Sequence, residues 1–239
     1  MKLLKHLPYL LAGFAFLGLS NQAVASPVGT ANITNCTPGG GFTFSATTIN
    51  WLPPAGAGLG CIATGLPTSI AYSGGTFTSG TGTIEDLPGG APGTFMLLAG
   101  GVLDYSLSAF AAPATTDGIC STTVALATGH SCIAFAGSPF LFTSQGATTA
   151  VSLDALGILT DTGNASTSPY SGLFTTQLIA NTAAIASTID AGGSITSTYS
   201  ATLATGPAGS ASTPEPATFA LLSTGVALLG IGRKRFGKG

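Results

Sequence analysis

Apolar and polar residues alternate with a period of two in short runs along the middle of the chain. The clearest runs are residues 42–45, 76–79, 132–135 and 140–143, and a weaker one covers residues 194–199. Because successive side chains of a β-strand point to opposite faces, this period predicts strands. Clusters of glycine, proline, asparagine and aspartate separate the runs, as in residues 38–41, 53–54, 73–75, 88–90, 117–118 and 162–164. The pattern predicts a mainly β fold, a single β-sandwich-like domain or a partly closed barrel, over residues 26–204.

One stretch departs from this period. Apolar side chains in residues 177–190 share one broad face at helical spacing, namely Leu178, Ile179, Ala183, Ile185 and Ile189. This spacing predicts a short helix. The chain is 45% hydrophobic and only 6% charged, which is the opposite of the disordered signature, so a packed core is expected despite 35 glycines.

The N-terminus has the three parts of a secretory signal peptide. Lys2 and Lys5 precede an apolar stretch at residues 7–19, and Ala23 and Ala25 form the A-x-A pattern that signal peptidase accepts. The apolar stretch of about 13 residues is shorter than the roughly 20 that a membrane span needs. We therefore predict that residues 1–25 are removed and that the mature chain begins at Ser26.

Charge is segregated along the chain. All six basic residues lie near the two ends, and none lies between residues 26 and 213. That interval contains seven acidic residues, which are Glu85, Asp86, Asp104, Asp117, Asp154, Asp161 and Asp190. Without cations the domain cannot neutralise phosphates, so nucleic acids and nucleotides are not expected as partners.

Four cysteines form an even set that suits two disulfides in an exported protein. Three connectivities are open, and we favour Cys36–Cys61 with Cys120–Cys132 because each pair joins sequence neighbours. No C-x-x-C spacing occurs and only one histidine lies in the domain, so a zinc site is not expected.

The C-terminal region also has three parts. Pro214-Glu215-Pro216 follows a flexible tether at residues 205–213 and precedes an apolar helix predicted at residues 217–232. That helix would be about 24 Å long, which makes it a short transmembrane span. The basic cluster Arg233, Lys234 and Arg235 is expected on the cytoplasmic side, which leaves the domain outside.

The Pro-Glu-Pro element, the apolar stretch and the basic cluster resemble a PEP-CTERM sorting signal over about residues 213–236. The resemblance implies export in a Gram-negative bacterium, processing by an exosortase near Pro-Glu-Pro, and association with extracellular polysaccharide or biofilm. The alternative is an ordinary C-terminal membrane anchor. Both place the domain outside the cytoplasmic membrane, and the resemblance does not extend to residues 26–204.

Candidate catalytic residues are few. His130 is the only general base that a hydrolase could use, and it lacks a G-x-S-x-G context. Asp161-Thr162-Gly163 is similar to an aspartic protease turn, but no second such turn occurs. Glu85 and Asp86 are adjacent, so on a strand they diverge instead of facing one bond. We therefore predict that the protein is not an enzyme and has no cofactor.

Calcium is a weaker candidate ligand. Asp161 and Asn164 lie in one loop that contains glycine and offer oxygen ligands, with Asp117 as a further candidate, but no EF-hand spacing is present.

The sequence favours an exported structural protein of the cell surface or extracellular matrix. One alternative is a carbohydrate-binding module with stacking aromatic side chains, for which the candidates are Trp51, Tyr72, Tyr105, Tyr170 and Tyr199. Core packing is the competing role for these rings. A secreted hydrolase is the remote alternative.

Overall fold

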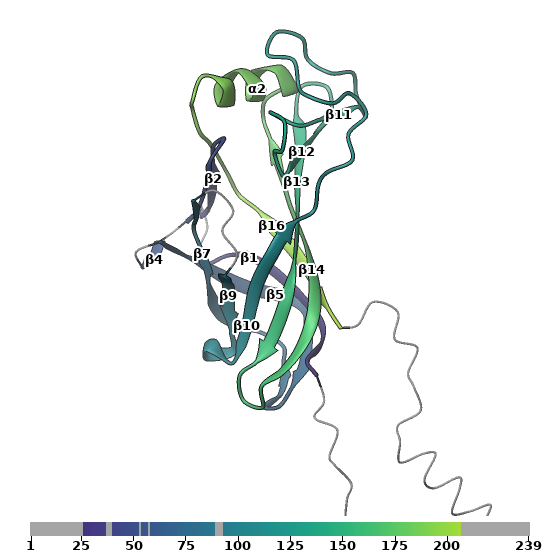
Figure 1. Cartoon of the computed structure of the whole chain (residues 1–239). Coiled ribbons are helices and arrows are strands. Elements are labelled where there is room, and N and C mark those ends of the chain that lie inside the picture. Colours follow the sequence, from purple (N-terminus) through teal and green to yellow (C-terminus); the bar gives the residue numbers. More distant parts are fainter. Residues whose placement is uncertain (1–25, 37–39, 53, 57, 89–92, 207–239) are drawn as a thin grey trace, which may run out of the picture. The chain divides into compact units, whose positions relative to one another are not determined.

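The structure is a computed structural model that describes residues 26–36, 40–52, 54–56, 58–88 and 93–206 (Figure 1). The predicted signal peptide, the apolar helix at residues 217–232 and the basic cluster lie outside the described residues. No helix within the described ranges is long and apolar enough to cross a membrane.

The described chain is mainly β, as predicted. The first half contains β1 (Val28–Asn35), β2 (Gly41–Phe44), β3 (Thr48–Leu52), β4 (Pro54–Gly56), β5 (Leu59–Tyr72), β6 (Gly75–Phe77), β7 (Thr81–Glu85), β8 (Leu87–Pro88) and β9 (Gly93–Leu98). The second half contains the 3-10 turn Ala99–Gly101, β10 (Leu103–Phe110), β11 (Ser131–Cys132), β12 (Phe140–Ser144), β13 (Thr149–Asp161), β14 (Ser166–Leu178), α2 (Thr182–Asp190), β15 (Ile195–Ser197) and β16 (Ser200–Thr205).

The larger sheet closes on itself. Its strands follow the order β10-β9-β7-β5-β1-β16-β14-β13, and β13 pairs back with β10. The recorded pairings in this ring are antiparallel, and the long hairpin β13–β14 is in continuous register from Thr149↔Leu178 to Asp161↔Ser166. This closure differs from the predicted sandwich and agrees with the partly closed barrel that was the other expectation.

The long strands alternate in burial as the period of two requires. In β13 every second residue from Thr149 to Asp161 is buried, and the residues between them are half-buried or exposed. β14 shows the same alternation around Tyr170 and Phe174. The buried set faces the inside of the closed sheet and forms one hydrophobic core with the smaller sheet.

The smaller sheet has the order β15-β2-β3-β8 and contributes large aromatic rings to this core. Phe44 of β2 lies 4.6 Å from Phe140 of β12, measured between ring centroids. Trp51 of β3 lies 4.8 Å from Tyr199 and 5.4 Å from Phe174. The smaller sheet is therefore held to the closed sheet by aromatic packing.

The predicted helix exists but begins later than its apolar spacing suggested. Gln177 and Leu178 end β14, where they pair with Ala150 and Thr149. The helix starts at Thr182 after Asn181, whose side-chain oxygen accepts a hydrogen bond from the backbone N–H of Ala184. Ile179 is 97% exposed and does not belong to the buried helix face, contrary to the expectation.

The boundary of the domain is also slightly different. Thr205 is the last residue of β16, where it pairs with Gly29 and Tyr170, so the tether predicted from residue 205 can begin only after it.

Replacing Trp51 with alanine should lower the free energy of unfolding by about 3–5 kcal/mol, because it removes a large side chain that is 1% exposed. Urea unfolding followed by circular dichroism measures the loss, since Trp51 is the only tryptophan and its fluorescence disappears with it. Tyr72→Ala is the control, because Tyr72 is half-buried and should cost less. A loss below about 1 kcal/mol would contradict the core role.

Candidate functional site

His130 forms one ion-pair contact, with Asp117. Its Nδ1 lies 2.9 Å from Asp117 Oδ2, and the side chain is 52% exposed. The Thr116 hydroxyl and then His130 lower the pKa of Asp117 below its ordinary value through their hydrogen bonds. The neighbouring Ser131 is buried, and its hydroxyl lies 3.5 Å from the Thr116 hydroxyl. Within the described residues, no hydroxyl group is hydrogen-bonded to the other ring nitrogen of His130.

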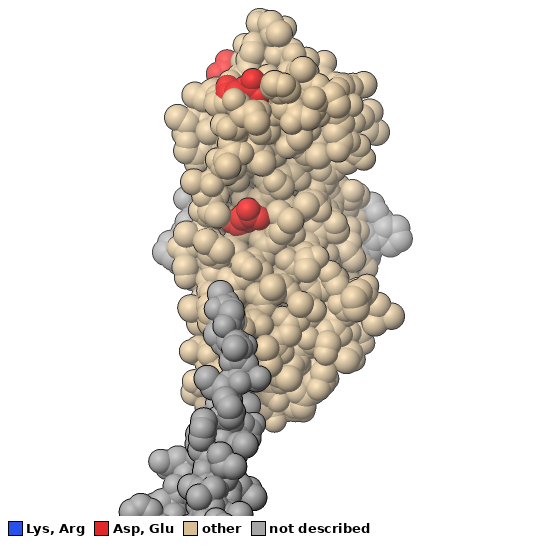
Figure 2. Space-filling model, turned by 90° about the vertical axis from the view of Figure 1, so that its right-hand side faces the viewer, with Lys and Arg blue, Asp and Glu red and all other residues tan. Residues whose placement is uncertain are grey.

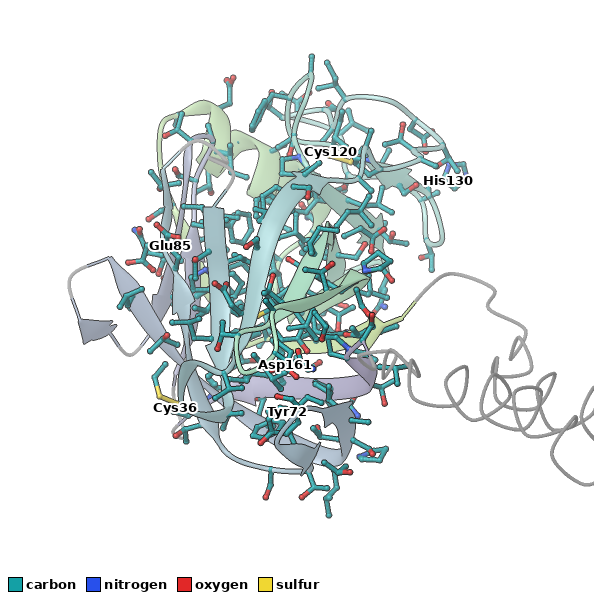
Figure 3. The ribbon with its side chains drawn as sticks, turned by 60° about the horizontal axis from the view of Figure 1, so that its bottom comes forward. Cys36, Tyr72, Glu85, Cys120, His130 and Asp161 are labelled. Carbon is teal, nitrogen blue, oxygen red and sulfur yellow. A yellow bond between two sulfur atoms is a disulfide. The ribbon has the colours of Figure 1, made fainter. Side chains whose placement is uncertain are left out.

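Asp161 is the last residue of β13, directly before the turn to β14, and is fully buried. One carboxylate oxygen accepts from the Ser73 hydroxyl (2.8 Å) and from the Gly163 N–H (2.9 Å), and the other accepts from the Ser73 N–H. Burial alone raises the pKa of this carboxyl group, but these hydrogen bonds outweigh it, and the pKa lies below its ordinary value. Asp161 thus joins the β13–β14 turn to the β5–β6 turn, which brings it beside Tyr72 and far from His130 (Figure 3).

The proposed calcium ligands are engaged within the protein. Both oxygens of Asp161 accept hydrogen bonds as described, and Asn164 Oδ1 accepts from the Ser166 N–H (3.0 Å) and hydroxyl (2.6 Å). Asp117 lies at the His130 contact instead. Among the described residues, no group of three or more His, Cys, Asp and Glu side chains is placed to hold a metal ion.

Glu85 and Asp86 also have different surroundings. Glu85 is exposed at the end of β7, whereas Asp86 Oδ1 accepts a hydrogen bond of 2.6 Å from the Trp51 N–H. Asp86 therefore fixes the strand that carries the buried tryptophan.

Four of the five aromatic side chains considered for sugar stacking belong to the core. Trp51, Tyr105, Tyr170 and Tyr199 are at most 4% exposed, and Tyr72 is half-buried. Burial raises the pKa of Tyr105 to about 12 against a smaller opposing effect of Thr205, and it also raises the pKa of Tyr170 and Tyr199. These rings cannot serve as an exposed stacking platform.

The four cysteines are paired in the connectivity that the sequence favoured. Cys36–Cys61 joins the residue after β1 to β5, and Cys120–Cys132 joins the 111–130 loop to β11. No cysteine is free.

A groove lies where β13 changes its partner. From Thr149 to Leu153 this strand pairs with β12, and from Ala155 to Asp161 it pairs with β10. At the change, the N–H of Ala111 donates to the carbonyl oxygen of Asp154 (2.8 Å), and the chain leaves the sheet. The groove has a volume of about 450 Å³ and is lined by Phe110, the last residue of β10, and Phe140, the first residue of β12. It is lined by residues 45–49, Leu87, residues 110–113, Ile133, Phe135 and residues 137–140.

The groove was missed by the sequence analysis. Its most prominent rings, Phe110 and Phe135, are half-buried and come from separate segments, and a third segment supplies the turn around Ala46 and Thr47. No local pattern joins these segments. The only local signal is the turn composition of residues 135–139, Phe-Ala-Gly-Ser-Pro, although Phe135 also ends the run of residues 132–135 that predicted a strand.

The groove and the described surface around it lack cations. None of the lining residues is charged. On the face in Figure 2, a few acidic side chains stand among uncharged residues, and no Lys or Arg is seen among the described residues. The arrangement can offer apolar surface and hydroxyl groups to a ligand, but it has no positive charge to bind an anion.

The processing residues fall mostly outside the described residues. Ala23, Ala25, the Pro-Glu-Pro element and Arg233, Lys234 and Arg235 belong to this set. Ser26 is described and is exposed before β1.

Comparison with protein-family models, curated proteins and solved structures gives no match.

Asp161→Asn should lower the free energy of unfolding by about 2 kcal/mol at pH 7, because a charged acceptor of three hydrogen bonds is lost. The lowered pKa means that this stabilisation is complete above the unfolded-state pKa of about 4 and is lost as the pH falls through the folded-state value. The difference between wild type and variant in urea unfolding should therefore shrink below pH 4. Asp154→Asn, an exposed change on the same strand, is the control. A difference that does not change with pH would contradict the assignment.

Proposed function

We propose that this protein is an exported, non-catalytic structural protein of the cell surface or extracellular matrix, processed at a PEP-CTERM-like signal. The observation that carries the proposal is the pairing of all four cysteines in two disulfides, because disulfides persist in oxidising compartments outside the cytoplasm. The signal-peptide pattern and the tripartite C-terminal pattern support the same location.

The geometry of the candidate catalytic groups supports a non-catalytic role. Asp161 and Asp86 hold backbone and hydroxyl groups of distant strands. His130 contacts Asp117 on an exposed loop, and no nucleophile is hydrogen-bonded to it among the described residues. Each of these groups has a structural or surface role that needs no substrate.

The absence of cations suits a polymer matrix of uncharged sugars. Seven carboxylates and no Lys or Arg between residues 26 and 213 repel anionic partners and leave hydroxyl and amide groups for contact. In this proposal signal peptidase and an exosortase are the processing partners, and extracellular polysaccharide is the structural partner.

The intact mass of the protein recovered from its native host, with and without reductant, tests this proposal. We expect a chain that begins at Ser26 and ends near Pro214, plus any attached sugar, and that gains four hydrogen atoms on reduction. A Pro214→Ala, Pro216→Ala variant is the matched control and should retain the C-terminal basic cluster.

Two results would contradict the proposal. A chain that retains residues 1–25 and stays in the cytoplasm would exclude export. A wild-type chain that retains Arg233 would exclude processing at Pro-Glu-Pro and would indicate a lasting membrane anchor.

Deletion of the gene should in addition weaken biofilm or floc cohesion.

A further inference from the structure

The groove at the partner change of β13 has the properties of a small-molecule site. Its volume of about 450 Å³ lies within the range of known ligand pockets. Phe110 and Phe135 line it as half-buried rings, so each has a surface that a ligand can cover. A ring that is packed on one side and open on the other offers a stacking face without a large loss of side-chain entropy.

The turn between β2 and β3 places an uncommitted hydroxyl donor at the groove. The hydroxyl oxygens of Ser45 and Thr48 are 2.9 Å apart and share one hydrogen bond. Ser45 Oγ also accepts from the backbone N–H groups of Thr47 and Thr48. Two hydroxyl groups carry two protons, and the bond between them uses one. The other proton is left for an acceptor outside the pair.

Ser138 supplies a second donor from the opposite segment. It is 1% exposed and lines the groove, and its oxygen accepts a hydrogen bond from the Phe140 N–H (3.3 Å). No hydrogen bond within the described residues uses the proton of this hydroxyl group. This proton is therefore free to be donated to a water molecule or to an oxygen of a ligand in the groove.

These features restrict the class of ligand. An anion is disfavoured, because no lining residue is charged. Between residues 26 and 213 the chain has no Lys or Arg, and its charged side chains, apart from His130, are acidic. A purely aliphatic ligand is disfavoured, because it would leave both hydroxyl donors without acceptors. A neutral sugar fits both requirements, since its hydroxyl and ring oxygens accept hydrogen bonds and its C–H face packs on an aromatic ring.

We propose that this groove binds one neutral hexose unit of a polysaccharide, with Phe135 and Phe110 as stacking faces and Ser138 and the Ser45–Thr48 pair as donors. The proposal rests on the proposed function for the place where the protein meets a polysaccharide. The binding itself depends only on the folded domain.

Isothermal titration of the purified, disulfide-bonded protein tests the proposal. The probes are the neutral oligosaccharides maltohexaose, cellohexaose and laminarihexaose, with polygalacturonate as the anionic probe and palmitate as the aliphatic probe. We expect saturable binding of at least one neutral oligosaccharide and none of the other two probes.

Substitutions in the groove locate the site. Phe135→Leu keeps an apolar side chain but removes the flat ring, and we expect the Kd to rise about tenfold. Ser138→Ala removes one donor and should raise the Kd by a similar factor of about ten. Tyr72→Ala is the control, because it removes a half-buried aromatic ring outside the groove lining and should leave the Kd unchanged. Urea unfolding of each variant confirms that the chain still folds.

Several outcomes would overturn the proposal. Failure of all three neutral oligosaccharides to bind would do so, as would binding that Phe135→Leu and Ser138→Ala leave unchanged. Binding of palmitate or polygalacturonate in their place would assign the groove to another ligand class. Sugar binding by a protein that is not exported in its host would leave this inference standing and overturn the proposed function alone. Export without sugar binding would do the reverse.

Discussion

The change of partner along β13 is the constraint on which the rest of the structure depends. The part of β13 that pairs with β10 closes the larger sheet, so the ring has no free edge there. The part of β13 that pairs with β12 cannot also pair with β10. The chain of β10 therefore leaves the edge of β13 near Asp154, where β12 takes its place. The chain between them fills this separation with the 111–130 loop, β11 and residues 133–139. The closure of the sheet and the separation of β10 from β12 beside the groove both follow from the register of β13 with its two partners.

The lack of cations imposes a different chemistry on the carboxylates. In most proteins Lys and Arg neutralise buried or half-buried carboxylates, but here backbone N–H and hydroxyl donors hold Asp86 and Asp161. Neutral donors stabilise a carboxylate without cancelling its charge. The domain therefore keeps a negative field while its interior hydrogen bonds are satisfied at these two positions. This negative field disfavours anionic partners and is consistent with the uncharged partner proposed above.

Local patterns predicted part of this fold. The period of two and the turn clusters located strands such as β2 and β12 closely, and sequence proximity favoured both disulfides. The predicted start of the helix, at residue 177, was wrong because Gln177 and Leu178 continue the β13–β14 ladder. Pairing between strands overrides the helical spacing there. A partly closed barrel was one of the expectations, but the strands that close the sheet were not predictable, because β10 meets β13 across some 40 residues of chain. The groove shares this origin, since its walls meet only after closure.

The walls of the groove are fixed before any ligand arrives. The turn at Ser45 is held by backbone and hydroxyl hydrogen bonds to Thr48, and the opposite segment follows directly from the Cys120–Cys132 disulfide. Backbone hydrogen bonds between Cys120 and Ile133 and between Gly118 and Ile133 hold the two sides of that disulfide loop together. A ligand that enters a preorganised groove does not have to order its walls, so little of the contact energy is lost to conformational entropy. In the proposed sugar complex, the hydroxyl donors and the two aromatic faces would meet the ligand without first being ordered.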